Sequence, residues 1–263
     1  RIAGSGAKFI FDFDDSIWLM DTSKANKRWE WLKNPLKTSE NIARANLVFA
    51  GNDHLAEYAR RYSPRVAVVP TTIDTDTHRP REDRGVVGPV VVGWSGSQTT
   101  LRHFEHRLEA LRAVKRRFGS RVSFEVIGPP GYRSEELGGV GRPWSLATEV
   151  SDHQRFDIGI MPLPDDPWAK GKCGCKGLIY MSMGVPTIMS PVGVNTEIIR
   201  HGENGLLAES DQEWEARLSE LIESPDRRRA LGDAGRQTVV SRYSVVAHRD
   251  SYVRHFRSVL SNP

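Results

Sequence analysis

The sequence has few of the features that mark secreted, disulfide-rich or membrane-spanning proteins. It contains only two cysteines in 263 residues, Cys173 and Cys175, and a disulfide between residues this close would be strained. Two thiols alone also cannot complete a tetrahedral zinc site. No apolar run approaches the roughly 18 residues of a membrane-spanning helix. We therefore expect reduced cysteines in a loop, no bound metal and a cytoplasmic protein.

Internal repeats and an initiating methionine are absent as well. The chain begins RIAGSGAKFIFDFDD, close to a predicted strand, which favours a fragment of a longer protein. Charged residues make up 27% and hydrophobic residues 38% of the chain, as in ordinary globular proteins. The formal charge of +4 suits an anionic ligand or a membrane surface. Many basic residues fall on the polar face of a helix predicted from Thr99 or Thr100 to Phe118, so we expect no nucleic-acid partner.

The most informative stretch is Asp157 to Glu197. Apolar runs predict buried strands at Asp157–Leu163 and Pro186–Ser190. Between them, the loop GKCGCKG places Lys172 and Lys176 among small residues just before a helix-like segment. Backbone N–H groups at a helix N-terminus beside strand ends favour phosphate. The stretch therefore predicts a nucleotide or phosphate site.

The rest of the chain indicates an α/β protein with two parts. Two more strands are predicted at Val90–Gly93 and Phe124–Gly128, and we expect all four to be parallel, with helices crossing between them. Residues 81–89 are charged and rich in glycine and proline, as a linker is. We expect an N-terminal part over 1–80, a second part over 90–240 and a C-terminal helix over 241–263.

The motifs DIGIMPL, GKCG-x-K, YM-x-x-G-x-P and SPVGVN-x-E, in this order, resemble the donor-binding half of family 4 glycosyltransferases, which have the GT-B fold. The resemblance runs from about Phe9 to Arg242, and VVPT-x-ID is similar to the end of the family's acceptor domain. It implies a GT-B-like fold with a complete Rossmann-like donor domain and only the last portion of the acceptor domain. In that fold the C-terminal helix crosses back to the first domain; the alternative for this basic, amphipathic helix is peripheral contact with a membrane.

The same resemblance implies a hexosyltransferase of polysaccharide or glycolipid assembly. A UDP- or GDP-sugar is the expected donor and a saccharide or lipid-linked molecule the acceptor. The reaction is expected to be retaining and to need neither metal nor cofactor, because lysines and helix dipoles stabilise the leaving diphosphate. The implied donor-binding residues are Gly96, Ser97, Lys172, Gly174, Cys175, Lys176, Val194, Asn195, Thr196 and Glu197. The implied base pocket consists of Arg142, Pro143 and Trp144; no catalytic residue is assigned.

The sequence departs from this family at two positions. Family members typically carry two glutamates eight positions apart, one near the donor sugar and one on the ribose. Gly171 and Ile179 stand at these positions here. Either the ribose is bound elsewhere, with Glu197 as the nearest acid, or this copy is weakly active or inactive.

A second function class remains open. FDFDDS resembles the first motif of haloacid-dehalogenase-like phosphatases, which would make Asp12 the nucleophile and Asp14 the acid/base beside Mg²⁺. Such an enzyme also needs a later acidic pair, for which only Asp165 and Asp166 are available.

Overall fold

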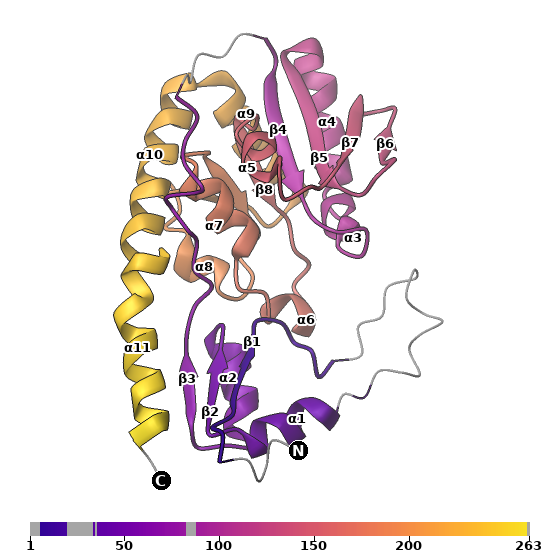
Figure 1. Ribbon diagram of the computed structural model, residues 1–263. Coiled ribbons are helices and arrows are strands. Elements are labelled where there is room, and N and C mark those ends of the chain that lie inside the picture. Colours follow the sequence, from indigo (N-terminus) through magenta and orange to yellow (C-terminus); the bar gives the residue numbers. More distant parts are fainter. Residues whose placement is uncertain (1–5, 20–33, 35, 83–87, 262–263) are drawn as a thin grey trace.

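Two sheets, one small and one large, organise the chain in the computed structural model (Figure 1). The structure describes residues 6–19, 34, 36–82 and 88–261; residues 83–87 of the predicted linker lie outside them. Both sheets consist mainly of parallel strands with helices packed on them, which is the α/β architecture that the sequence predicts.

The small sheet has the strand order β1-β2-β3, and all its pairs are parallel. Its strands are β1 (Ile10–Phe13), β2 (Leu47–Ala50) and β3 (Val66–Val68). Helices α1 (Leu36–Arg44) and α2 (Asp53–Arg60) belong to the same part. The apolar strand β2 is buried along its whole length, as expected for the central strand of a covered sheet.

The large sheet has the order β10-β9-β8-β4-β5-β7-β6. Its strands are β4 (Val90–Ser95), β5 (Val122–Gly128), β6 (Arg133–Ser134), β7 (Gly139–Pro143), β8 (Ile158–Met161), β9 (Thr187–Met189) and β10 (Leu206–Leu207). Every pair is parallel except β6 with β7. The four strands predicted in this region are therefore confirmed as neighbours in one parallel sheet.

Helices alternate with the strands of this sheet, and several of them pack on it (Figure 1). They are α3 (Leu101–Glu105), α4 (Leu108–Phe118), α5 (Glu149–His153), α6 (Pro167–Lys170), α7 (Cys175–Ser182), α8 (Asn195–Ile198), α9 (Asp211–Glu223) and α10 (Pro225–Arg242). Trp94 of β4 and Trp214 of α9 are both at most 1% exposed and belong to one core cluster. The single helix predicted up to Phe118 is wrong in one respect: Arg107 leaves the helical conformation and pairs with Asp211, so the segment is two helices.

The order of strands in the large sheet reverses at β4. The chain passes from β4 to β5 on one side, and later returns to β8 on the other side of β4. In open α/β sheets, ligands bind outside the carboxyl ends of the strands at such a point. A ligand site is therefore expected at the carboxyl end of β4, at Ser95 and Gly96.

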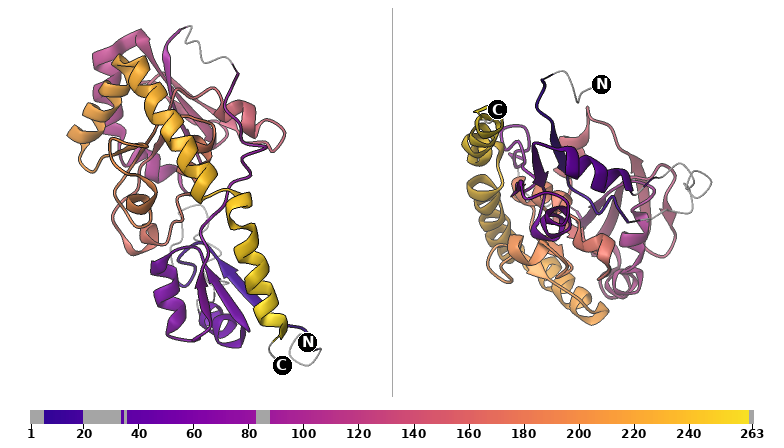
Figure 2. Two further views of the ribbon diagram at one scale, coloured as in Figure 1. Left: turned by 90° about the vertical axis from the view of Figure 1, so that its left-hand side faces the viewer. Right: turned by 90° about the horizontal axis from the view of Figure 1, so that it is seen from below.

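Helix α11 (Val245–Ser261) lies beside the small sheet, continuing the line of α10 along the molecule (Figures 1 and 2). Val259 shares an apolar cluster with Leu47 and Phe49 of β2. The Phe49 ring centroid is 5.7 Å from that of Tyr252, in an edge-to-face arrangement. The last helix thus ties the C-terminal end of the chain to the N-terminal sheet. Within the described ranges, no helix combines the length and apolar character needed to cross a membrane.

Candidate functional site

A cavity of about 580 Å³ lies at the carboxyl ends of β4 and β5, where the strand order reverses. Its lining residues are Ser95, Gly96, Ser97, Gln98, Gly128, Pro130, Pro143, Trp144, Glu149, His153, Lys176 and Ile179. Five residues predicted for the donor and base sites meet here, namely Gly96, Ser97, Pro143, Trp144 and Lys176. Ile179, at the position where a ribose-binding glutamate is expected, lies in the same cavity.

The ends of the two central strands approach each other very closely. Gly128 has φ +122°, and a Cβ atom there would lie 1.6 Å from the Gly96 carbonyl oxygen, so only glycine fits. The Gly96 amide donates to the Ile127 carbonyl at 2.9 Å, and the Ser97 amide donates to Thr100 Oγ1 at 3.0 Å. These two amides are already bonded, so Gly96 and Ser97 shape the wall of the cavity more than they offer free donors.

Lys176 supplies a positive charge to this cavity. It is the second residue of α7, and its Nζ lies 5.9 Å from the centroid of the Trp94 ring. In the described part of the chain it forms no ion pair with a carboxylate. Burial is the largest effect that lowers the pKa of Lys176, followed by the charge of Lys172. A poorly solvated ammonium at a helix N-terminus has an unsatisfied preference for an anion.

His103 lies near this lysine and is only 3% exposed. Burial lowers the pKa of His103 to about 4, and the next contribution is the charge of Lys176. The imidazole is therefore neutral at pH 7, and it adds no further positive charge beside the lysine.

The lining also contains Trp144, Glu149 and His153, which are hydrogen-bonded in different ways. Trp144 is 52% exposed, and its Nε1 donates to Glu149 Oε1 at 3.1 Å. His153 Nδ1 lies 2.8 Å from the Glu149 carbonyl oxygen. Since a carbonyl only accepts, Nδ1 carries the hydrogen and Nε2 of the neutral ring is an acceptor. That Nε2 atom is buried, and among the described residues it has no hydrogen-bond partner.

Glu149 and His153 were not predicted from the sequence. They are adjacent to the predicted base pocket in the chain, but only the packing of α5 brings them to the cavity. One hint of their role is present in the sequence: Glu149 follows Trp144, a residue of the predicted base pocket, by five positions. Burial lowers the pKa of His153, which keeps the ring neutral and its Nε2 available as an acceptor.

Lys172 was assigned to the same diphosphate as Lys176, but it is not among the residues that line the cavity. Helix α7 begins at Cys175, so the two lysines do not share a helix face. Lys172 Nζ instead forms an ion pair with Asp15 of the N-terminal part, at 2.8 Å. In addition, Asn52 Nδ2 donates to the carbonyls of Lys170 and Lys172, at 3.3 and 3.2 Å.

Gly171 has no room for a side chain. A Cβ atom at this position would lie 2.1 Å from Ser16 Oγ, a residue of the N-terminal part. The Ser16 hydroxyl also donates to the Pro167 carbonyl at 3.2 Å. The absence of an acid at position 171 therefore has a steric reason: the loop after β1 occupies the space that the acid would need.

The remaining predicted residues lie outside the lining of the cavity. Arg142 faces Glu125, with 3.7 Å between Nε and Oε2, and Glu197 is exposed. The amides of Asn195 and Thr196 are bonded within their own turn, to Val192 and Gly193. Gly174, Cys175 and Val194 stand at the starts of α7 and α8. Both cysteines are free thiols.

Asp12 and Asp14 line a different cavity, of about 300 Å³, at the carboxyl end of β1. Burial raises the pKa of Asp12, and the neighbouring Asp14 raises it further. The second acidic pair that a phosphatase needs is engaged elsewhere: Asp166 caps α6, and Asp165 pairs with Lys170 at 3.1 Å. In the described ranges no three histidine, cysteine or acidic side chains are grouped as metal ligands.

Two Rossmann-like parts, with a cavity where the strand order of the second reverses, are the arrangement of the GT-B fold. Residues 89–224 match the family Glycosyl transferases group 1. The chain belongs to this family, and it is a glycosyltransferase by class. No curated protein matches the chain.

Several solved structures have a similar fold. Sucrose-phosphate synthase from Thermosynechococcus elongatus has 14% identity and a TM-score of 0.73, over 99% of this chain and 70% of that one. HepE from Anabaena, solved with UDP and glucose, has 15% identity and a TM-score of 0.72, over 95% and 72%. A TarM variant from S. aureus, solved with UDP among its ligands, has 12% identity and a TM-score of 0.72, over 96% of this chain and 51% of its own. The chain thus spans about half of TarM.

Proposed function

We propose that the protein transfers a hexosyl group from a nucleotide-sugar, with UDP or GDP as the nucleotide, to a saccharide or lipid-linked acceptor. The observation that carries this proposal is Lys176, a cation without a carboxylate partner that lines the cavity at the switch point. The diphosphate of the donor is the anion that this ammonium stabilises. UDP and glucose in HepE, which shares the fold, support this choice of donor.

The nucleoside end of the donor is assigned to the wall formed by Trp144, Glu149 and His153. The half-exposed Trp144 ring offers an aromatic face for a base. The Glu149 carboxylate accepts hydroxyl hydrogen bonds from the ribose, a role that Ile179 cannot fill. His153 Nε2 is a second acceptor, since it has no partner within the described structure. The ribose is thus held by α5, and Glu197 is not needed for it.

Transfer is assigned as retaining and independent of metal, with Lys176 and the N-terminus of α7 stabilising the charge on the departing diphosphate. Residues 90–240 bind the donor and residues 1–80 belong to the acceptor side. The cavity lined by Asp12, Asp14, Thr71 and Tyr252 supports an acceptor rich in hydroxyl groups, because carboxylates and a tyrosine suit such a ligand. We also propose that, within this class, the protein belongs to family 4.

Titration calorimetry with UDP, GDP and ADP tests the donor site without an acceptor. We expect Lys176→Ala to weaken binding of the preferred nucleotide by about 1.5–3 kcal/mol, the usual scale of a hydrogen bond to a charged group. Glu149→Gln should weaken binding by roughly 1 kcal/mol, because the ribose loses a charged acceptor. The free energy of unfolding should not fall in Lys176→Ala, since the variant removes a poorly solvated charge that has no ion-pair partner.

Lys37→Ala is the matched control, because Lys37 is exposed on α1 and far along the chain from the cavity. It should change neither binding nor stability by more than about 0.5 kcal/mol. Equal nucleotide affinity in the parent and in Lys176→Ala would place the diphosphate elsewhere. A parent protein that binds none of the three nucleotides would contradict the proposed donor site.

A further inference from the structure

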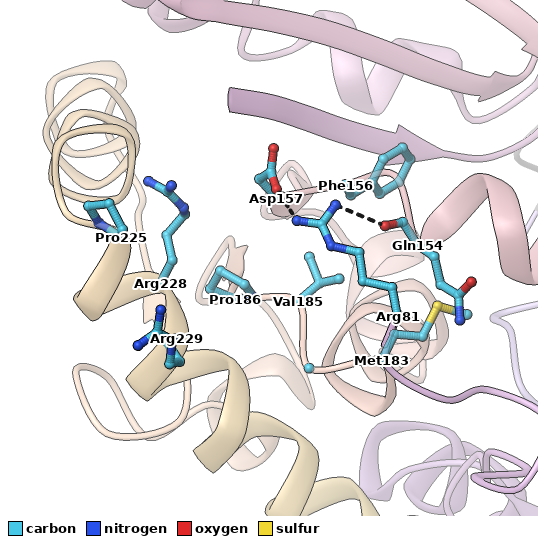
Figure 3. Close-up of a pocket in the computed structure, with 11 residues that line it drawn as sticks. Arg81, Gln154, Phe156, Asp157, Met183, Val185, Pro186, Pro225, Arg228 and Arg229 are labelled. Carbon is cyan, nitrogen blue, oxygen red and sulfur yellow. Dashed lines mark hydrogen bonds and ion pairs between the residues drawn. The ribbon is translucent and has the colours of Figure 1, made fainter. Parts of the chain in front are cut away.

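A second, smaller cavity is distinct from the cavity lined by Lys176 and Trp144, which we call the donor cavity after its proposed function (Figure 3). It has a volume of about 70 Å³ and is bordered by Asp157 and Pro186, which stand just before β8 and β9. Because parallel strands share one direction, the amino ends of β8 and β9 lie at the far edge of the sheet from Lys176 and Trp144. The two cavities are therefore separate sites.

Three guanidinium groups surround this second cavity. Arg81 comes from the segment that joins the two sheets, whereas Arg228 and Arg229 come from the start of α10 (Figure 3). Among the described residues that line the cavity, Asp157 supplies the one carboxylate. Its two oxygens are already occupied, Oδ1 by Arg81 Nη2 at 2.8 Å and Oδ2 by the Val91 amide at 2.9 Å. The three cations and one anion leave the lining with an excess of two positive charges.

Arg228 is the least compensated of these cations. It is only 7% exposed, and its Nη1 donates to the carbonyls of Leu221 and Ile222, at 2.5 and 3.2 Å. These are neutral acceptors at the end of α9, and within the described residues Arg228 forms no ion pair. Arg229 has Asp226 at 3.9 Å, an exposed contact that contributes little. A buried guanidinium facing a cavity with excess positive charge favours an anion.

We propose that this cavity binds a phosphate group, held by the guanidiniums of Arg81, Arg228 and Arg229. The volume is several times what one water molecule needs, which suits a tetrahedral oxyanion better than a whole nucleotide. Guanidinium is also the side-chain group that matches phosphate geometry best. The phosphate is either free inorganic phosphate or the terminal group of a phosphate monoester whose remainder stays in solvent.

Binding at this place joins two segments that connect the parts of the molecule. Arg81 precedes β4 in the connection from the small sheet, and α10 leads into α11, which packs on the small sheet. A phosphate that bridges Arg81 to Arg228 and Arg229 therefore fastens both connections to the large sheet. The expected consequence is a higher melting temperature with phosphate than with chloride at equal ionic strength.

Titration of the full chain with inorganic phosphate, followed by calorimetry at constant ionic strength, tests the proposal. Wild type should show one saturable site that chloride does not compete for at the same ionic strength. Arg229→Gln should weaken phosphate binding by about 5-fold, and Arg229→Glu by more than about 10-fold, because a single partly exposed charge is first removed and then reversed. The Arg229 side chain is 64% exposed, so both Arg229 variants should fold normally. Lys176→Ala should retain the site, which separates it from the donor cavity.

Arg116→Glu provides the matched control, since Arg116 is exposed on α4 and the substitution makes the same change in net charge. It should bind phosphate as wild type does. Absence of saturable phosphate binding in wild type would overturn the proposal, and so would equal weakening by Arg116→Glu and Arg229→Glu. A parallel titration with a hexose 6-phosphate identifies the source: tighter binding than inorganic phosphate points to an ester, and equal or weaker binding points to the free ion.

Discussion

His103 shows how a single residue acquires unusual properties from its surroundings. The ring is buried next to Lys176, and burial and this charge lower the pKa of His103 to about 4. An unfolded histidine titrates near 6.5. Between these values the unfolded chain binds more protons than the native protein, so the stability falls as the pH decreases from about 6.5 towards 4.

We expect His103→Gln to reduce this pH dependence. Urea unfolding at pH 7.5 and pH 5 should give a loss of stability in wild type that is about 1–2 kcal/mol larger than the loss in the variant, since one proton-linked group has been removed. His106 and His153 also have pKa values lowered by burial, so the variant should retain part of the effect. An identical loss of stability in wild type and variant would mean that the pKa of His103 is the same in the folded and the unfolded state.

At the level of elements, the loop before α7 is fixed by the N-terminal part of the chain. Asn52 stands at the centre of this contact: its Oδ1 accepts from the Leu55 amide at 2.9 Å and caps α2, while its Nδ2 donates to the loop carbonyls of Lys170 and Lys172. Cys173 Sγ also donates to the Asp14 carbonyl at 3.2 Å. One buried amide therefore stabilises a helix start and the contact between two parts at once.

Asn52→Ala should lower the free energy of unfolding by about 2–3 kcal/mol, because the helix loses its cap and two carbonyls lose a donor. Asp53→Ala is a suitable comparison, since Asp53 is exposed in the first turn of the same helix and is not the cap. It should cost at most about 1 kcal/mol, through the lost interaction with the helix dipole. Chemical denaturation of both variants measures the difference; equal effects would contradict the bridging role of Asn52.

At the scale of the whole molecule, α11 is the element that returns from the large part to the small one. Its buried residue Val259 packs against β2, and Phe49 is surrounded by the rings of Tyr252, His255 and Phe256. The small sheet has three strands within the described residues, which gives it a limited core of its own. Its stability should therefore depend on this helix.

Val259→Ala should lower the stability of the small sheet by roughly 1–3 kcal/mol, the scale of a buried methyl deletion. In hydrogen-exchange mass spectrometry, peptides covering Leu47–Ala50 should exchange faster, whereas those covering Val122–Gly128 should not change. Val246→Ala makes the same chemical change on the same helix at a position that is 66% exposed, and it should leave both peptides as in wild type. Uniform acceleration in both sheets would mean that the molecule unfolds as one unit.

The sequence by itself was sufficient for the strands of the large sheet, and the proposed class of ligand also rests on local patterns in it. Continuous apolar runs alternating with helical segments predicted parallel strands at Val90–Gly93 and Phe124–Gly128, because strands buried on both faces have that pattern. Glycine-rich loops between strand and helix predicted an anion site there. These features depend on neighbouring residues only, so a linear pattern is enough to find them.

Only the tertiary structure decided which side chains share a site. It brought Glu149 and His153 of α5 to the wall of the cavity at the end of β4, directed Lys172 to Asp15, and gave Gly171 no space beside Ser16. The cavity lined by Arg81 and Arg228, where we propose a phosphate site, likewise joins segments that no motif connects. Such contacts depend on the order of the strands and on how the two parts pack, and neither is encoded in the spacing of residues along the chain.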